Sequence, residues 1–186
     1  MEPRGDVTLT PPHLNALPGL IGGRVVLLNS PTVAAWIESF RAWPEGFEFE
    51  LCVATAAGVV SNNKLGEMDI DFWGHQENTD ALFELGVRAA GQEASNTSSL
   101  GLPRHHAEAP ELSLRPNGGG GGGDHEIGTF WRTSWWLTPL PTTGEVEFWC
   151  SWKSGGVPRS AQSIDASRLA RAADRSVSLW RESPEA

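Results

Sequence analysis

Alternation of apolar and polar side chains with a period of two is the feature that most constrains the fold of this chain. In residues 47–53 every second residue is Phe, Leu or Val, and the residues between them are Glu or Cys. The same alternation recurs in residues 68–72 and 83–89. A β-strand places successive side chains on opposite faces, so each segment is predicted to be a strand with one buried face.

Four further segments have the short apolar character of strands and are bounded by Gly, Pro, Asn or Asp: residues 24–29, 111–115, 124–137 and 145–152. The count of seven or eight short strands before one helix is typical of an antiparallel sandwich rather than an alternating α/β fold. The predicted fold class is therefore mainly β: an antiparallel β-sandwich, immunoglobulin-like or jelly-roll-like, with one C-terminal amphipathic helix.

Residues 33–42 fit two secondary structures, a helix and a strand. Val33, Trp36, Ile37 and Phe40 recur at helical spacing behind Ser30 and a proline, which is a helix-start signal. Val33, Ala35 and Ile37 also alternate as in a strand. The residues alone leave both alternatives open.

The last predicted element changes to a helical period. Ile164 and Leu169 can bracket an Asp165 N-cap as a hydrophobic staple. Continuing the pattern, one face would carry Leu169, Ala173, Val177 and Trp180, and the opposite face Arg168, Arg171, Asp174 and Arg175. The sequence predicts an amphipathic helix that ends near Trp180.

Six consecutive glycines, Gly118 to Gly123, precede the most aromatic part of the chain. Such a run fits a loop, an anion nest or a close approach of backbone to a neighbour. No phosphate-loop lysine follows it, and the next segment is strand-like, so an anion nest is disfavoured. We expect a crossover into the aromatic segment rather than a domain linker.

The chain is predicted to form a single domain over residues 21–181, with a flexible proline-rich tail over residues 1–20 and a short tail over 182–186. Its formal net charge is -9, and residues 38–93 hold eleven acidic and three basic residues. This balance argues against nucleic-acid binding. No signal or membrane-spanning segment is visible, so we expect a soluble, cytoplasmic protein.

Metals and cofactors are not expected. Cys52 and Cys150 belong to no paired ligand motif and are predicted to be separate, reduced thiols. The histidines His75, His105, His106 and His125 lack the spacing that places two imidazoles on one helix face.

Segments 124–137 and 145–152 are predicted to form a hairpin with Leu137 opposite Val146. Trp135 would then pair with Phe148 on the core face. The other face would collect Phe130, Arg132, Trp136 and Trp149, which we call the predicted aromatic face. It could stack a sugar ring or a peptide, or be covered by the C-terminal helix or by a second copy of the chain.

Glu67, Asp69 and Asp71 would form an acidic row on one strand face. Three carboxylates in a row could bind Ca²⁺ or act as a general acid–base pair. A solvated edge that discourages strand addition explains the same pattern without a ligand.

Several local sequences together resemble a family of uncharacterised actinobacterial proteins. They are AWPEGFEF at residues 42–49, the glycine run, Trp135–Trp136 with PLP at 139–141 and Gly144, and the closing residues 164–166, 172–173 and 179–180. The resemblance spans roughly residues 24–180 and is weakest over 56–109. It implies one coherent domain and a strand at residues 33–42, and it implies no activity.

Three functions follow as hypotheses. The first is a non-catalytic β-sandwich that acts through protein contacts or self-association, using the hairpin and the acidic middle of the chain. The second is a carbohydrate-like ligand-binding module that uses the predicted aromatic face. The third is a hydrolase-type enzyme with its acidic centre at Asp69 and Asp71.

Overall fold

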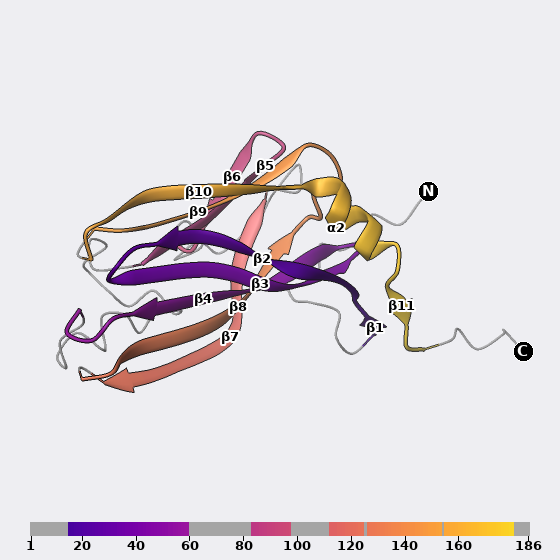
Figure 1. Ribbon diagram of the computed structural model, residues 1–186. Helices are drawn as coiled ribbons and strands as arrows, with labels where there is room; N and C mark the ends of the chain where they lie inside the picture. Colours follow the sequence, from indigo (N-terminus) through magenta and orange to yellow (C-terminus); the bar gives the residue numbers. More distant parts are fainter. Residues whose placement is uncertain (1–14, 60–82, 98–111, 125, 154, 181–186) are drawn as a thin grey trace, which may run out of the picture.

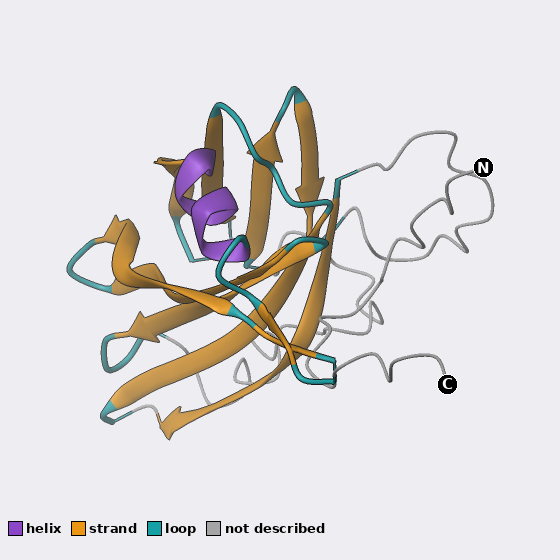
Figure 2. Ribbon diagram, turned by 90° about the vertical axis from the view of Figure 1, so that its right-hand side faces the viewer, coloured by secondary structure: helices purple, strands orange, loops and turns teal. Residues whose placement is uncertain are grey.

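The computed structural model describes residues 15–59, 83–97, 112–124, 126–153 and 155–180, which form two antiparallel β-sheets packed face to face (Figures 1 and 2). The five-stranded sheet has the order β2-β3-β4-β8-β7, and the four-stranded sheet the order β10-β9-β5-β6. A small separate sheet pairs β1 with β11. The strands and the helix are β1 Ala16–Leu17, β2 Gly19–Asn29, β3 Val33–Trp43, β4 Gly46–Thr55, β5 Glu84–Ala89, β6 Gln92–Ser95, β7 Ser113–Asp124, β8 Gly128–Thr138, β9 Glu145–Trp152, β10 Val157–Asp165, α2 Ala166–Ala173 and β11 Val177–Ser178.

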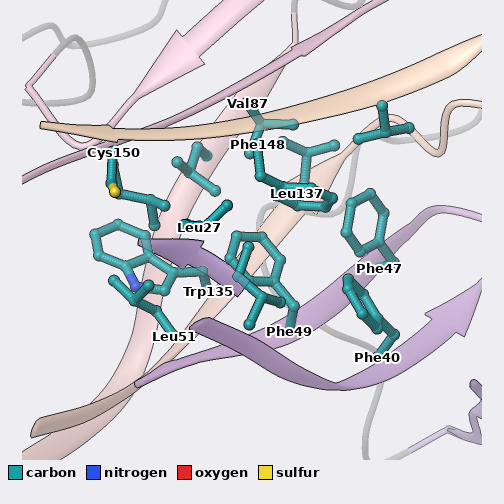
Figure 3. Close-up of a cluster of buried hydrophobic side chains, with 14 of the residues drawn as sticks. Leu27, Phe40, Phe47, Phe49, Leu51, Val87, Trp135, Leu137, Phe148 and Cys150 are labelled. Carbon is teal, nitrogen blue, oxygen red and sulfur yellow. The ribbon is translucent and has the colours of Figure 1, made fainter. Parts of the chain in front are cut away.

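The predicted fold class is confirmed: the described residues are mainly β, the sheets are antiparallel, and one short helix lies near the C-terminus. The core lies between the sheets, where four phenylalanines meet (Figure 3). The Phe148 ring of β9 lies 5.2 Å from Phe49 and 5.8 Å from Phe40, both of the other sheet. These rings bury large apolar area and join the two layers.

Segment 33–42 is a strand, although a helix-start signal precedes it. The Ser30 hydroxyl accepts a hydrogen bond from the backbone N–H of Val33 at 3.0 Å. This is the contact that an N-cap serine would make, but here it tightens the turn between β2 and β3. Ala35 and Ile37 are fully buried in β3, so the alternating pattern describes this segment correctly.

The predicted hairpin is wrong. β8 pairs with β4 and β7, whereas β9 pairs with β5 and β10, so residues 139–144 cross from one sheet to the other. The assignment of buried faces is nevertheless right, because Trp135 and Phe148 both lie in the core. Alternation identifies the buried face of a strand but does not identify its neighbour, and here the two rows face each other across the sandwich.

The glycine run is strand, and the predicted crossover loop is also wrong. Gly119 to Gly123 pair with Thr133 to Thr129 of β8, so the run forms an edge of the five-stranded sheet. A β-carbon on Gly121 would overlap the Trp131 ring and lie 2.6 Å from the carbonyl oxygen of Phe130. Of the alternatives considered from the sequence, close backbone approach is the one that this position adopts.

Tryptophan lying across glycine recurs in this fold. A β-carbon on Gly86 would overlap the indole of Trp149, its partner on β9, and one on Gly46 would overlap Trp136. The missing side chains leave room for each indole to lie against the backbone of the neighbouring strand.

The C-terminal helix is shorter than predicted. Asp165 is its N-cap, as expected, and accepts from the Ser167 backbone N–H at 2.7 Å. The helix packs on β2 and β3 and ends at Ala173. The chain then turns, and Val177 pairs with Leu17 of β1. Val177 and Trp180 therefore do not extend the helical apolar face, and Trp180 is 68% exposed.

The N-terminal segment predicted as a tail contributes structure from Ala16 onward, since β1 and the start of β2 lie within residues 16–20. No helix among the described residues has the length and apolar character needed to cross a membrane.

Candidate functional site

The four residues of the predicted aromatic face lie in different places. Phe130 and Arg132 are exposed on the outer face of the five-stranded sheet. Trp136 is only 1% exposed and packs edge-on against Trp43, with the ring centroids 5.7 Å apart. Trp149 belongs to the four-stranded sheet, is 6% exposed, and lies under the Arg159 guanidinium, 3.9 Å from its ring centroid. The structure thus brings together only Phe130 and Arg132.

The acidic row Glu67, Asp69 and Asp71 lies outside the described residues. In the part of the chain that is described, no group of three His, Cys, Asp or Glu side chains could hold a metal ion.

Glu38 is the centre of a polar cluster on the outer face of the five-stranded sheet. Its carboxylate accepts hydrogen bonds from Trp36 Nε1 at 3.1 Å, Arg132 at 3.0 Å and the Cys52 thiol at 3.5 Å. The Trp36 hydrogen bond is the main cause that holds the pKa of Glu38 below its usual value, against a smaller effect of burial. A general acid needs the opposite shift, so this carboxylate is poorly suited to proton donation.

A second cluster joins Glu48 to Arg41 and Asn117 on the same sheet. Glu48 is 2% exposed, its Oε2 lies 2.9 Å from Arg41 Nε, and its Oε1 accepts from Asn117 at 2.6 Å. The Arg41 contact has the geometry of an ion pair rather than a linear hydrogen bond. Partners so close neutralise the buried charge, which indicates a structural role for the cluster.

A shallow hollow of about 520 Å³ opens beside these clusters, where β2 and β3 both depart from regular pairing. It is lined by Glu38, Glu50 and Arg41 and by residues 20–23. Ser39 lies in it with φ of 60°, the left-handed region that non-glycine residues rarely adopt. Its charged groups are already paired with each other, Arg41 reaching Glu50 at 3.6 Å.

Five of the exposed large apolar side chains of the described residues lie on or next to the β1–β11 sheet. Leu17 and Val177 are paired across it, and the Leu179 N–H donates to the Asn15 carbonyl at 2.8 Å. We call the following side chains, with their exposed fractions, the terminal patch: Leu17 54%, Leu20 65%, Val177 57%, Leu179 40% and Trp180 68%. Figure 1 shows β1 and β11 side by side at one end of the sandwich.

Three arginines line a hollow of about 280 Å³ next to the terminal patch, and we call it the arginine hollow. Arg168, Arg171 and Arg175 form one wall and residues 20–22 the other, so Leu20 belongs to both surfaces. Arg171 donates to the Ser167 hydroxyl at 3.0 Å, and Arg175 donates to the carbonyls of Arg171 and Leu20. A guanidinium has five N–H donors, so most donors of the three arginines remain available to an anion.

Among the described residues, no acidic side chain lines the arginine hollow. Asp165 lies nearby on the same helix, and hydrogen bonds from Ser167 are the main cause that lowers its pKa, followed by the charges of Arg171 and Arg168. The sequence showed these arginines on the outer side of the helix. Nothing in the sequence indicated that they lie beside Leu20, because the two segments are at opposite ends of the chain.

Both cysteines are buried and free, as predicted. Burial raises the pKa of both thiols, that of Cys150 to about 12. The reactive thiolate of Cys150 is therefore about a thousandfold less populated than that of an exposed cysteine.

We expect a disulfide reagent at mildly alkaline pH to label neither thiol rapidly in the folded protein and both after unfolding in guanidinium. Rapid labelling of one thiol in the folded protein would contradict the buried placement.

Compared with protein-family models, curated proteins and solved structures, the chain shows no match.

Proposed function

We propose that this protein is a non-catalytic β-sandwich that binds another protein through the terminal patch and the arginine hollow. Five large apolar side chains that are exposed on or next to the β1–β11 sheet carry the proposal, since groups of exposed apolar side chains mark surfaces that bind other proteins. Trp and Arg are also the residue types that contribute most to the energy of protein interfaces.

The chemistry of the two surfaces defines the partner. The apolar side chains of the terminal patch favour Leu, Val or Phe on the partner, and the guanidinium groups of the arginine hollow favour carboxylates. We therefore propose a protein segment that carries both acidic and apolar residues. This surface replaces the hairpin and the acidic middle of the chain, from which the sequence hypothesis began.

Carbohydrate binding is the second candidate, and it has less support. It required Trp136 and Trp149 as open stacking platforms, and both rings are covered, Trp136 by Trp43 and Trp149 by Arg159. The enzyme hypothesis stays a prediction, because its acidic centre at Asp69 and Asp71 lies outside the described residues.

An array of acidic peptides containing Leu and Phe tests the proposal, with the same peptides carrying Lys in place of Asp and Glu as the comparison. We expect wild-type protein to bind the acidic set. Arg168→Glu/Arg171→Glu and Val177→Asp/Leu179→Asp should each weaken binding tenfold or more, about 1.4 kcal/mol.

Arg24→Glu/Arg132→Glu is the matched control, because it makes the same charge change on the outer face of the five-stranded sheet. It should leave peptide binding unchanged. Equal binding of acidic and basic peptides, or equal loss in the control, would refute the proposal.

A further inference from the structure

The glycine part of β7, residues 118–122, lies at an edge of the five-stranded sheet. β8 lies on one side of it, and the sheet order ends with β7. Residues 118–122 are exposed to solvent, and β8 is the one strand that pairs with them in the described part of the chain. A strand at a sheet edge presents a row of backbone donors and acceptors that can pair with another strand.

Open edges are usually protected, and residues 120–123 have none of the usual devices, because the register shift of β7 lies before them, between Pro116 and Gly119. Lysine, proline or inward-pointing charges on an edge strand discourage pairing. A β-carbon on Gly120 or Gly122 would have nothing within 4 Å, so this edge meets no steric obstacle from neighbouring side chains.

The opposite edge of the same sheet is different. β2 carries two register shifts in its pairing with β3, and the Ser160 hydroxyl of β10 donates to the Leu27 carbonyl. Bulges and a bound neighbour both hinder the addition of a strand. Among the described strands, the glycine part of β7 is thus the one edge of the five-stranded sheet that is open to pairing.

We propose that two copies of this chain associate through their β7 edges, antiparallel about a two-fold axis, so that their five-stranded sheets become one continuous sheet. A two-fold contact requires a self-complementary surface, and a glycine backbone is self-complementary because it offers only alternating donors and acceptors. A foreign extended peptide is selected through pockets for its alternate side chains, and the open space at Gly120 and Gly122 offers none.

The protected β2 edge determines the size of the assembly. Once two β7 edges have paired, neither copy retains an open edge among the described strands of this sheet, so association stops at the dimer and does not continue into a fibre. The contact is mainly backbone and smaller than a standard interface of about 1,600 Å², so the dimer forms in a concentration-dependent equilibrium.

This dimer is separate from the proposed partner binding. The glycine end of β7 and the β1–β11 sheet lie at opposite ends of the molecule (Figure 1). A β7 variant should lose the dimer and keep peptide binding, and a terminal-patch variant should do the reverse.

Sedimentation velocity over a range of concentrations measures the association. Wild-type protein should shift from one chain mass towards two as concentration rises. Gly120→Lys/Gly122→Lys should remain monomeric, because it places like charges next to those of the second copy. Neither position has a positive φ, so both tolerate a side chain. The control Ala161→Lys/Ser163→Lys adds the same charge to β10, where both residues are exposed, and should dimerise.

A charge-swap experiment identifies the edge directly. Gly120→Glu/Gly122→Glu alone should be monomeric, and mixing it with the lysine variant should give a heterodimer. Hydrogen exchange gives a readout without any substitution, since backbone amides of residues 118–123 in the wild type should exchange more slowly at high concentration. A wild type that stays monomeric throughout, a dimer that survives the lysine variant, or concentration-independent exchange would each overturn the proposal.

Discussion

Replacing Phe148 with alanine is expected to lower the free energy of unfolding by about 3–5 kcal/mol. Phe148 is fully buried on β9, and its ring contacts three phenylalanines of the five-stranded sheet: Phe40, Phe47 and Phe49 (Figure 3). Truncation removes the contact that joins the two layers and leaves a cavity between them, because strands held by backbone ladders close it only partly. Guanidinium denaturation followed by circular dichroism measures the loss.

Phe130→Ala is the matched control for this variant. Phe130 is 39% exposed on the outer face of the five-stranded sheet, and its ring lies 6.0 Å from Trp36. Removing it leaves no enclosed cavity, so the free energy of unfolding should fall by less than about 1 kcal/mol. A loss at Phe130 equal to that at Phe148 would show that the core is not where the structure places it.

The buried faces of the strands were predictable from sequence, but strand pairing was not. Alternation around Phe49 and around Phe148 reports the direction in which each side chain points, and both directions are right. Which strand lies beside which depends on the connection at residues 139–144. This connection has the length of a hairpin loop but crosses between the sheets.

The ends of elements were predicted wrongly where the same local sequence signal occurs in two different structures. Ser30 makes its cap-like hydrogen bond to Val33 in a turn rather than at a helix start. Val177 continues the helical spacing of Leu169, yet it pairs with Leu17, far away in the sequence. A two-residue strand has no periodicity, so nothing local distinguishes it from the last turn of a helix.

The candidate site, too, could be predicted only where its residues lie on one strand or helix. Phe130 and Arg132 are two residues apart on one exposed strand face and were correctly placed together. The terminal patch and the arginine hollow combine residues 17–22 with residues 168–180, which meet through the β1–β11 pairing and the packing of α2 on β2. A sequence pattern predicts the faces of a single helix or strand, whereas these surfaces arise from contacts between the two ends of the chain.

Gly121→Ala is expected to lower the free energy of unfolding by about 1–3 kcal/mol, although it adds a single methyl group. That methyl would overlap the Trp131 ring and lie 2.6 Å from the Phe130 carbonyl oxygen. Trp131 is 6% exposed and belongs to the core cluster, so its ring cannot rotate away without loss of packing. The carbonyl oxygen is backbone of the neighbouring strand, and its displacement would disturb the β7–β8 ladder.

Gly122→Ala, one residue further along the same strand, should be neutral or stabilise the fold by about 0.4–1 kcal/mol. Its added methyl group points into open space, and alanine restricts the unfolded chain more than glycine does. Thermal and guanidinium unfolding of the two variants therefore separates the two explanations of the glycine run. If glycine serves only mobility, both variants behave alike; if the run is a strand that covers Trp131, then of these two positions only Gly121 has to be glycine.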